Sequence, residues 1–186
     1  MGWYGDTVNR AVTERDRGGD DFLANVCREW EAEADRAGEV RTVKLRTGLV
    51  LDPNGGALAR MIPLFKAGIG GRMGSGQQWW SWITLRDQIG AIKHLLQSDL
   101  AGPINMTAPN PATNSVVTAA LARALHRPAL LPVPGFALKI ALGGFSSEVL
   151  GSKKVLPEAL LADGYQFQDE HIQPALATML AEQHAA

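Results

Sequence analysis

The residues best suited to ligand binding are three tryptophans in QQWWSWIT, residues 77–84. In a strand, Trp80 and Trp82 share one face and Trp79 lies on the other. Two neighbouring indoles can stack on a sugar or another flat ring, and the same pair can equally fill a core. The preceding GIGGRMGSG, residues 68–76, either lets backbone approach a ligand or forms an ordinary loop. The predicted substrate contacts are Gly74, Ser75, Gly76, Gln78, Trp80 and Trp82.

The sequence lacks the spacing of known dinucleotide-binding, phosphate-binding and metal-binding motifs. A dinucleotide fingerprint GxGxxG that starts at Gly68 places Met73 where the third glycine is required. No lysine follows a glycine, which excludes a Walker-type phosphate loop, and the four histidines are scattered without ligand spacing. Cys27 has no histidine near it in the sequence and is expected to be a small buried hydrophobe. We predict no metal site and leave the catalytic residues unassigned.

Composition narrows the class of partner. A net charge of -1, with 46% apolar and 20% charged residues, lacks the basic excess that nucleic acid requires. One cysteine excludes an internal disulfide, and no apolar run is long enough to cross a bilayer. These features favour a protein of the reducing cytoplasm that binds neither nucleic acid nor membrane.

Hydrophobic periodicity predicts alternating helices and strands. Phe22, Val26 and Trp30 recur every four residues, which predicts an amphipathic helix capped by Asp20 or Asp21. The further expected elements are a buried strand over 40–51, a helix over 56–68 that Pro63 bends or ends, a strand over 78–85, a helix over 86–97, a short strand over 102–107, a helix after Asn114 as N-cap, and helical pieces from there to a last helix near 170–183. We therefore predict an α/β fold with a boundary near Pro109.

Several segments together resemble a known family in order and over nearly the whole chain. They are WYGD, DFLANVCREWE, RTGLVL-DPNGGALARMIPLFKAGIGG-MGSG-QWWSWI, INMTAPNPATN, RPALLPVP and KKVLPEALLADGYQF. This series resembles the epimerase-like branch of the extended short-chain dehydrogenases/reductases, whose members end in a small domain of uncharacterised function.

The resemblance implies a particular place for this chain in the family fold. WYGD follows the fifth strand of the nucleotide-binding sheet in the family, so the glycine-rich phosphate loop would precede Met1, which we suspect to be an internal or misassigned start. Residues 1–109 are then expected to be the C-terminal half of a Rossmann-like NAD(P)-binding sheet, and 110–186 a small, mostly helical domain. NADP(H) or NAD(H) is expected in the full-length protein, and none bound by this chain alone.

The resemblance also implies candidate site residues. The family segment that leaves the strand at RTGLV passes the nicotinamide, so Arg46, Thr47, Gly48 and Leu49 are the predicted cofactor contacts, although Arg46 can equally be a salt-bridged strand end. The Tyr-x-x-x-Lys pair of classical relatives is absent, since Leu23 and Cys27 stand at its positions. In the following strand, ITLRD keeps only Asp87 of the histidine- and aspartate-rich pattern, with Thr84 and Arg86 substituted.

Two classes of function remain open on this evidence. The first is the C-terminal part of an NAD(P)-dependent epimerase or oxidoreductase that acts on a sugar-like or other small substrate. The second is a catalytically inactive module that senses NADP(H) or docks on another chain. In both, the strand after Arg41 leaves an unpaired edge, so we expect either self-association or pairing with a missing N-terminal half.

Overall fold

A computed structural model describes residues 2–129, 131–136, 140 and 146–185. The first elements are η1 (Gly2–Tyr4), β1 (Ala11–Val12), α1 (Phe22–Asp35), β2 (Val43–Thr47), β3 (Leu49–Leu51), α2 (Gly56–Lys66), β4 (Trp79–Trp80) and β5 (Trp82–Thr84). They are followed by α3 (Leu85–Gln97), β6 (Gly102–Met106), β7 (Ala112–Thr113), α4 (Asn114–Ala124), α6 (Ser146–Leu150), β8 (Lys154–Val155), α7 (Glu158–Ala162) and α8 (Ile172–Ala185). Met1 and the helical pieces predicted over 137–139 and 141–145 lie outside the described residues.

The strand predicted over 40–51 is two strands that pair with different partners. β2 runs parallel to β6, and β3 runs parallel to β5. The exchange occurs at Gly48, whose N–H donates to the carbonyl of Met106, while the next N–H, that of Leu49, donates to the carbonyl of Ser81. A Cβ on Gly48 would lie 2.6 Å from that Ser81 oxygen, so only glycine fits this crossing. The parallel pairs confirm the predicted α/β fold with Rossmann-like strands.

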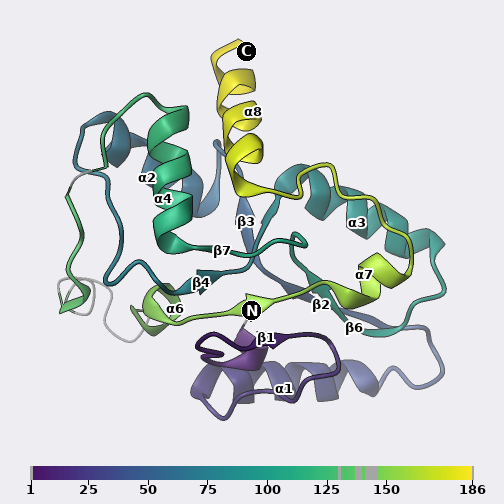
Figure 1. The fold of residues 1–186 in the computed structure, drawn as a ribbon. Coiled ribbons are helices and arrows are strands. Elements are labelled where there is room, and N and C mark those ends of the chain that lie inside the picture. The colour runs from purple at the N-terminus through teal and green to yellow at the C-terminus, as the bar shows by residue number, and fades with distance from the viewer. Residues whose placement is uncertain (1, 130, 137–139, 141–145, 186) are drawn as a thin grey trace.

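Helices cover both faces of the β2–β6 pair. α1 and α3 lie on opposite sides of it (Figure 1). On the α3 side, Ala91 and Leu95 pack against Ile104 and Met106 of β6 and against Leu160 of α7. On the α1 side the contacts are ionic, because the side chains of β2 there are lysine and arginine.

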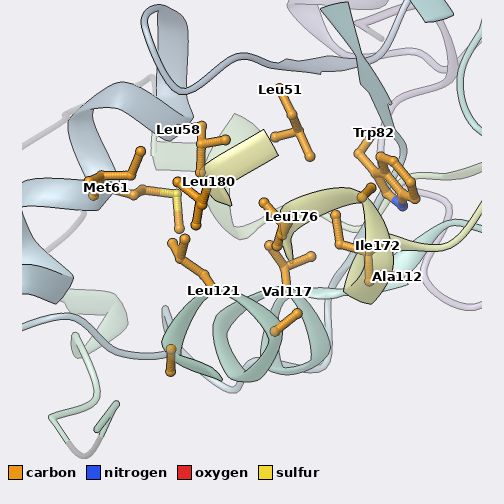
Figure 2. Close-up of a cluster of buried hydrophobic side chains, with 14 of the residues drawn as sticks. Leu51, Leu58, Met61, Trp82, Ala112, Val117, Leu121, Ile172, Leu176 and Leu180 are labelled. Carbon is orange, nitrogen blue, oxygen red and sulfur yellow. The ribbon is translucent and has the colours of Figure 1, made fainter. Parts of the chain in front are cut away.

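A larger apolar cluster joins α2, α4 and α8. Leu58 and Met61 of α2 face Leu121 of α4 and Leu176 and Leu180 of α8 (Figure 2). The cluster includes residues from both sides of the boundary predicted near Pro109. That boundary therefore stays a prediction, and the described halves share a core.

Helix ends agree with the sequence at one position and differ at another. Asp21 caps α1 as predicted, and its carboxylate accepts the N–H of Ala24 at 2.8 Å. The predicted N-cap Asn114 is instead the first residue of α4, because the extended residue before the helix is Thr113. The Asn114 side chain accepts the N–H of Met73. Pro63 lies within α2, which continues to Lys66.

The apolar stripe of α1 is largely uncovered. Phe22 is 77% exposed and Trp30 is 71% exposed, although their spacing predicted a packed face. Among the described residues, β2 pairs with β6 alone, and Leu45 on it is 42% exposed. The strand predicted to be buried is therefore only partly buried over β2. Its other edge, predicted to be unpaired, has no partner strand among the described residues.

Candidate functional site

Arg46, the first of the predicted cofactor contacts, is held in a buried ion pair. Its Nε and Nη2 donate to the carboxylate of Glu31 at 2.7 and 2.9 Å, and its Nη1 donates to the Tyr4 hydroxyl at 3.0 Å. Its Cζ lies 3.8 Å from the ring centroid of Trp3, a cation–π contact. Burial lowers the pKa of Arg46, but the hydrogen bonds and charges of Glu31 and Tyr4 outweigh it and raise this pKa above its ordinary value. The geometry is that of a salt-bridged strand end.

Tyr4 continues this polar network toward β6. Its hydroxyl donates to Asn105 Oδ1 at 2.7 Å, and Asn105 Nδ2 donates to the carbonyl of Leu156 at 2.9 Å. Burial raises the pKa of Tyr4, and this keeps the phenol protonated. Tyr4 thus links the first turn to β6 and, through Asn105, to the C-terminal part. Its phenol is protonated, so it can donate a hydrogen bond but cannot act as a base.

The other three predicted cofactor contacts follow Arg46 along the chain. Thr47 ends β2, Gly48 makes the crossing, and Leu49 begins β3. Gly48 is closed off by the backbone of Ser81 and the methyl of Thr107, at 2.6 and 2.9 Å from the position of a Cβ. A dinucleotide therefore has no approach to the backbone at Gly48 from that side.

A pocket of about 400 Å³ lies between α1 and β2. Arg46 and Thr47 line it, together with the partly exposed Trp3, the exposed Trp30 and Cys27. Its other lining residues are Gly2, Glu31, Ala34, Val43, Lys44 and Leu45. The pocket opens beside the free edge of β2, so it is a groove between a helix and a sheet edge.

The helix face that should carry a proton-transfer pair carries apolar and thiol groups. Leu23 and Cys27 both adjoin Gly2, since a Cβ there would lie 3.1 Å from Leu23 Cβ and 3.3 Å from Cys27 Sγ. Leu23 has no titratable group, so the tyrosine–lysine pair cannot form on this face. The described residues also include no group of three or more histidine, cysteine, aspartate or glutamate side chains that could hold a metal ion.

The predicted substrate contacts divide into exposed and buried residues. Ser75 is exposed in the turn between Gly74 and Gly76, both of which have positive φ. Gln78 is buried and its Nε2 donates to the carbonyl of Met73 at 2.9 Å.

The two predicted stacking tryptophans differ in accessibility. Trp80 is half-buried, and its Nε1 donates to the carbonyl of Val149 at 3.4 Å. Trp82 has no exposed surface, packs in the α2–α4–α8 cluster and donates to the carbonyl of Asn110 at 3.0 Å. Of these two tryptophans, only Trp80 has an indole surface that a ligand can reach.

The ITLRD segment is hydrogen-bonded to the C-terminal part of the chain. Asp87, fully buried, accepts hydrogen bonds from the Tyr165 hydroxyl at 3.0 Å and from the N–H of Asp169 at 2.9 Å. The Asp169 carboxylate accepts from Thr84 Oγ1 at 2.8 Å and from Arg86 at 3.0 Å. Burial, with the nearby Asp87, raises the pKa of Tyr165. The substituted positions are thus structural, and sequence reasoning missed their partner because it lies more than eighty residues away.

Sequence reasoning also missed a second pocket, of about 300 Å³, beside α4. Its polar lining residues are Arg72, Ser115 and Thr118. Arg72 lies in the glycine-rich loop, and the serine and threonine are three residues apart on α4. That spacing was the available signal, since residues three apart share a helix face.

The chain is similar to known proteins over nearly all of its length. A family model described as a domain of unknown function (DUF1731) matches residues 133–179. An epimerase family protein of Mycobacterium bovis is 43% identical over 180 residues, which are 95% of this chain and 60% of that protein. The chloroplastic homologue of epimerase family protein SDR39U1 from Arabidopsis thaliana is 42% identical over 182 residues, 97% of this chain and 52% of the relative.

A solved structure agrees with the same assignment. The human epimerase family protein SDR39U1 (isoform 2), crystallised with NADPH, has a TM-score of 0.92 and 34% identity, over 96% of this chain and 62% of that one. UDP-glucose 4-epimerase of Thermus thermophilus with NAD, at 16% identity and a TM-score of 0.63, shares the fold.

The parallel strands and flanking helices define part of a Rossmann-like α/β protein. Over the segment that it spans, the chain is similar to epimerase family proteins at 42–43% identity, which supports an epimerase-like member of the extended short-chain dehydrogenase/reductase family. It covers about 60% of the length of the Mycobacterium bovis relative. In the part of the chain that the structure describes, no helix has the length and apolar character needed to cross a membrane.

Proposed function

We propose that this chain is the substrate-side part of an NAD(P)-dependent epimerase-like protein. The observation that carries the proposal is the 43% identity over 95% of the chain, which nevertheless accounts for only 60% of the relative. The human relative at a TM-score of 0.92 was crystallised with NADPH, which supports NADP(H) or NAD(H) as the cofactor of the complete protein. A bound nicotinamide supplies hydride transfer, and the protein supplies orientation and electrostatics.

The chain alone is proposed not to bind the dinucleotide. Pyrophosphate binding in this architecture needs a glycine loop at a helix N-terminus, and the predicted contact residues do not form one. Arg46 has its donors engaged by Glu31 and Tyr4, and Gly48 is covered by Ser81. These residues fit the wall beside a nicotinamide and not the cradle of its phosphates.

The free edge of β2 is the proposed place where the dinucleotide-binding part packs. Gly102 donates to the carbonyl of Thr42 and Gly48 donates to that of Met106, so the even-numbered residues of β2 face β6. In a parallel ladder the N–H and C=O groups of alternate residues point to opposite edges, so those of Val43 and Leu45 point outward. An added strand there would also close the pocket against Trp30.

A second candidate function is a catalytically inactive module that senses NADP(H) or docks on another chain. The favouring observation is the pair Leu23 and Cys27 beside Gly2, where the family resemblance places a tyrosine and a lysine. Without that pair, the usual proton transfer to a substrate oxygen lacks its tyrosine donor. A docking role would use the same exposed edge and apolar face, through a second copy or a separate N-terminal half.

A chimera tests the first proposal. The segment of the Mycobacterium bovis relative that precedes the aligned region is joined to this chain, and NADPH binding is followed by its fluorescence, with the chain alone as control. We expect saturable binding by the chimera and none by the chain. A folded chimera that does not bind NADPH would contradict the proposal. A chimera that binds NADPH but shows no turnover would favour the catalytically inactive sensing module.

A further inference from the structure

The second pocket combines polar residues on one side with small apolar residues on the other. Ser115, Thr118 and Ala119 lie on one face of α4, and Arg72 approaches from the loop before β4. Ala129 and Pro132 complete its described lining. The volume of about 300 Å³ is at the lower end of ligand pockets, which suits a fragment of a few heavy atoms.

Arg72 gives this pocket a positive charge. Its stem packs against Gly76, where a Cβ would lie 3.3 Å from Arg72 Cδ and 2.7 Å from Ser115 Oγ. None of the ion pairs among the described residues involves Arg72. The pocket also adjoins the first turns of α4, the positive end of the helix dipole. The N–H groups of Asn114 and Ser115, the first two of α4, are taken by the carbonyls of Gln78 and Gly76, so these two are not available to a ligand.

Two buried polar atoms of α4 lack partners among the described residues, and one of them belongs to a residue that lines the pocket. Thr118 lines the pocket, is 4% exposed, and has an unpaired Oγ1. Asn114, four residues earlier and fully buried, accepts the N–H of Met73 through Oδ1 while its Nδ2 is unpaired. Buried polar groups in native proteins are nearly always paired, so the unpaired hydroxyl of the pocket residue Thr118 indicates a missing partner.

We propose that this pocket binds the oxyanion group of a small acid, a carboxylate or a phosphate ester. The Arg72 guanidinium neutralises the charge, the Thr118 hydroxyl donates to an oxygen, and Ala119, Ala129 and Pro132 contact a short hydrocarbon part. As a statement about substrate class it rests on the proposed function. The binding itself needs no cofactor.

Calorimetric titration of the chain at constant ionic strength tests the site with two probes, inorganic phosphate in one arm and butyrate in the other. The probe that binds more tightly shows whether the site prefers a phosphate or a carboxylate. Arg72→Gln is expected to weaken that binding about tenfold or more, because a charged hydrogen bond is lost. Thr118→Val keeps the shape, removes only the hydroxyl, and is expected to weaken binding severalfold while the fold stays intact.

Arg60→Gln is the matched control, since Arg60 is an exposed arginine of α2 that does not line this pocket. It should bind like the unmodified chain. The proposal is overturned if neither anion binds, if Arg72→Gln binds unchanged, or if Arg60→Gln weakens binding equally. Because no NADPH is present, such a failure leaves the cofactor result on the chimera standing.

Discussion

Arg46→Met provides the sharpest test of the polar network that joins β2 to α1. Methionine keeps the apolar stem and removes the guanidinium, which leaves the Glu31 carboxylate, only 15% exposed, without its partner. Removing one member of a buried pair costs about 3 to 5 kcal/mol, and the Tyr4 hydrogen bond and the Trp3 contact are lost with it. Because the Glu31 side chain keeps 15% of its surface exposed, its carboxylate retains some hydration, so we expect a loss at the lower end of this range, about 3 kcal/mol in the free energy of unfolding.

The assay is urea unfolding followed by tryptophan fluorescence. Lys44→Met is the control, because the Lys44 partner Asp35 is 63% exposed and such a pair contributes about 0 to 1 kcal/mol. The double variant Arg46→Met with Glu31→Gln should cost less than the sum of its single variants, since no charge is then buried alone. A loss below about 1 kcal/mol for Arg46→Met, or strict additivity in the double variant, would refute the reasoning.

Three further outcomes follow from the structure. Tyr165→Phe removes a hydroxyl that donates to a buried carboxylate of α3 and should lower the free energy of unfolding by about 1 to 2 kcal/mol in the same urea assay. The hydrogen bond from Ser98, followed by that from His94, lowers the pKa of Asp163. The Asp163 carboxylate therefore contributes stability above its ordinary pKa, and this stability is lost as the pH falls through the lowered pKa. Asp163→Asn should make the free energy of unfolding less dependent on pH between about pH 5 and pH 2. Leu45→Lys places a charge on the free edge of β2 and should reduce self-association in light scattering, whereas unchanged assembly would place the contact elsewhere.

The sequence predicted the elements that depend on local pattern. The cap at Asp21, the helical periodicity after it and the β-branched run after Arg41 are local signals, and the structure has helices and strands there. The exchange of partners at Gly48 was not predictable, because it depends on Ser81 and Met106, which approach only in the folded chain.

The candidate site was predictable only in part. Strand alternation predicts that Trp80 and Trp82 share a face, but it does not predict that Trp82 is more buried than Trp80. That difference in burial depends on the packing of α8. Arg46 had two open interpretations because its carboxylate partner, Glu31, is on a separate helix. The sequence around Arg72 is a glycine-rich loop with no helical or strand periodicity, and the position of Arg72 relative to Thr118 depends on how α4 packs.

Amide hydrogen exchange of the chimera, compared with the chain alone, tests the central claim most directly. If the dinucleotide-binding part packs along β2, the outward N–H groups of Val43 and Leu45 become hydrogen-bonded and exchange much more slowly in the chimera. The N–H of Gly48, already bonded to Met106, serves as the internal reference. Slow exchange at both residues, strengthened by NADPH, is the predicted result. Equal exchange at Val43 and Leu45 in the chimera and in the monomeric chain would contradict the account.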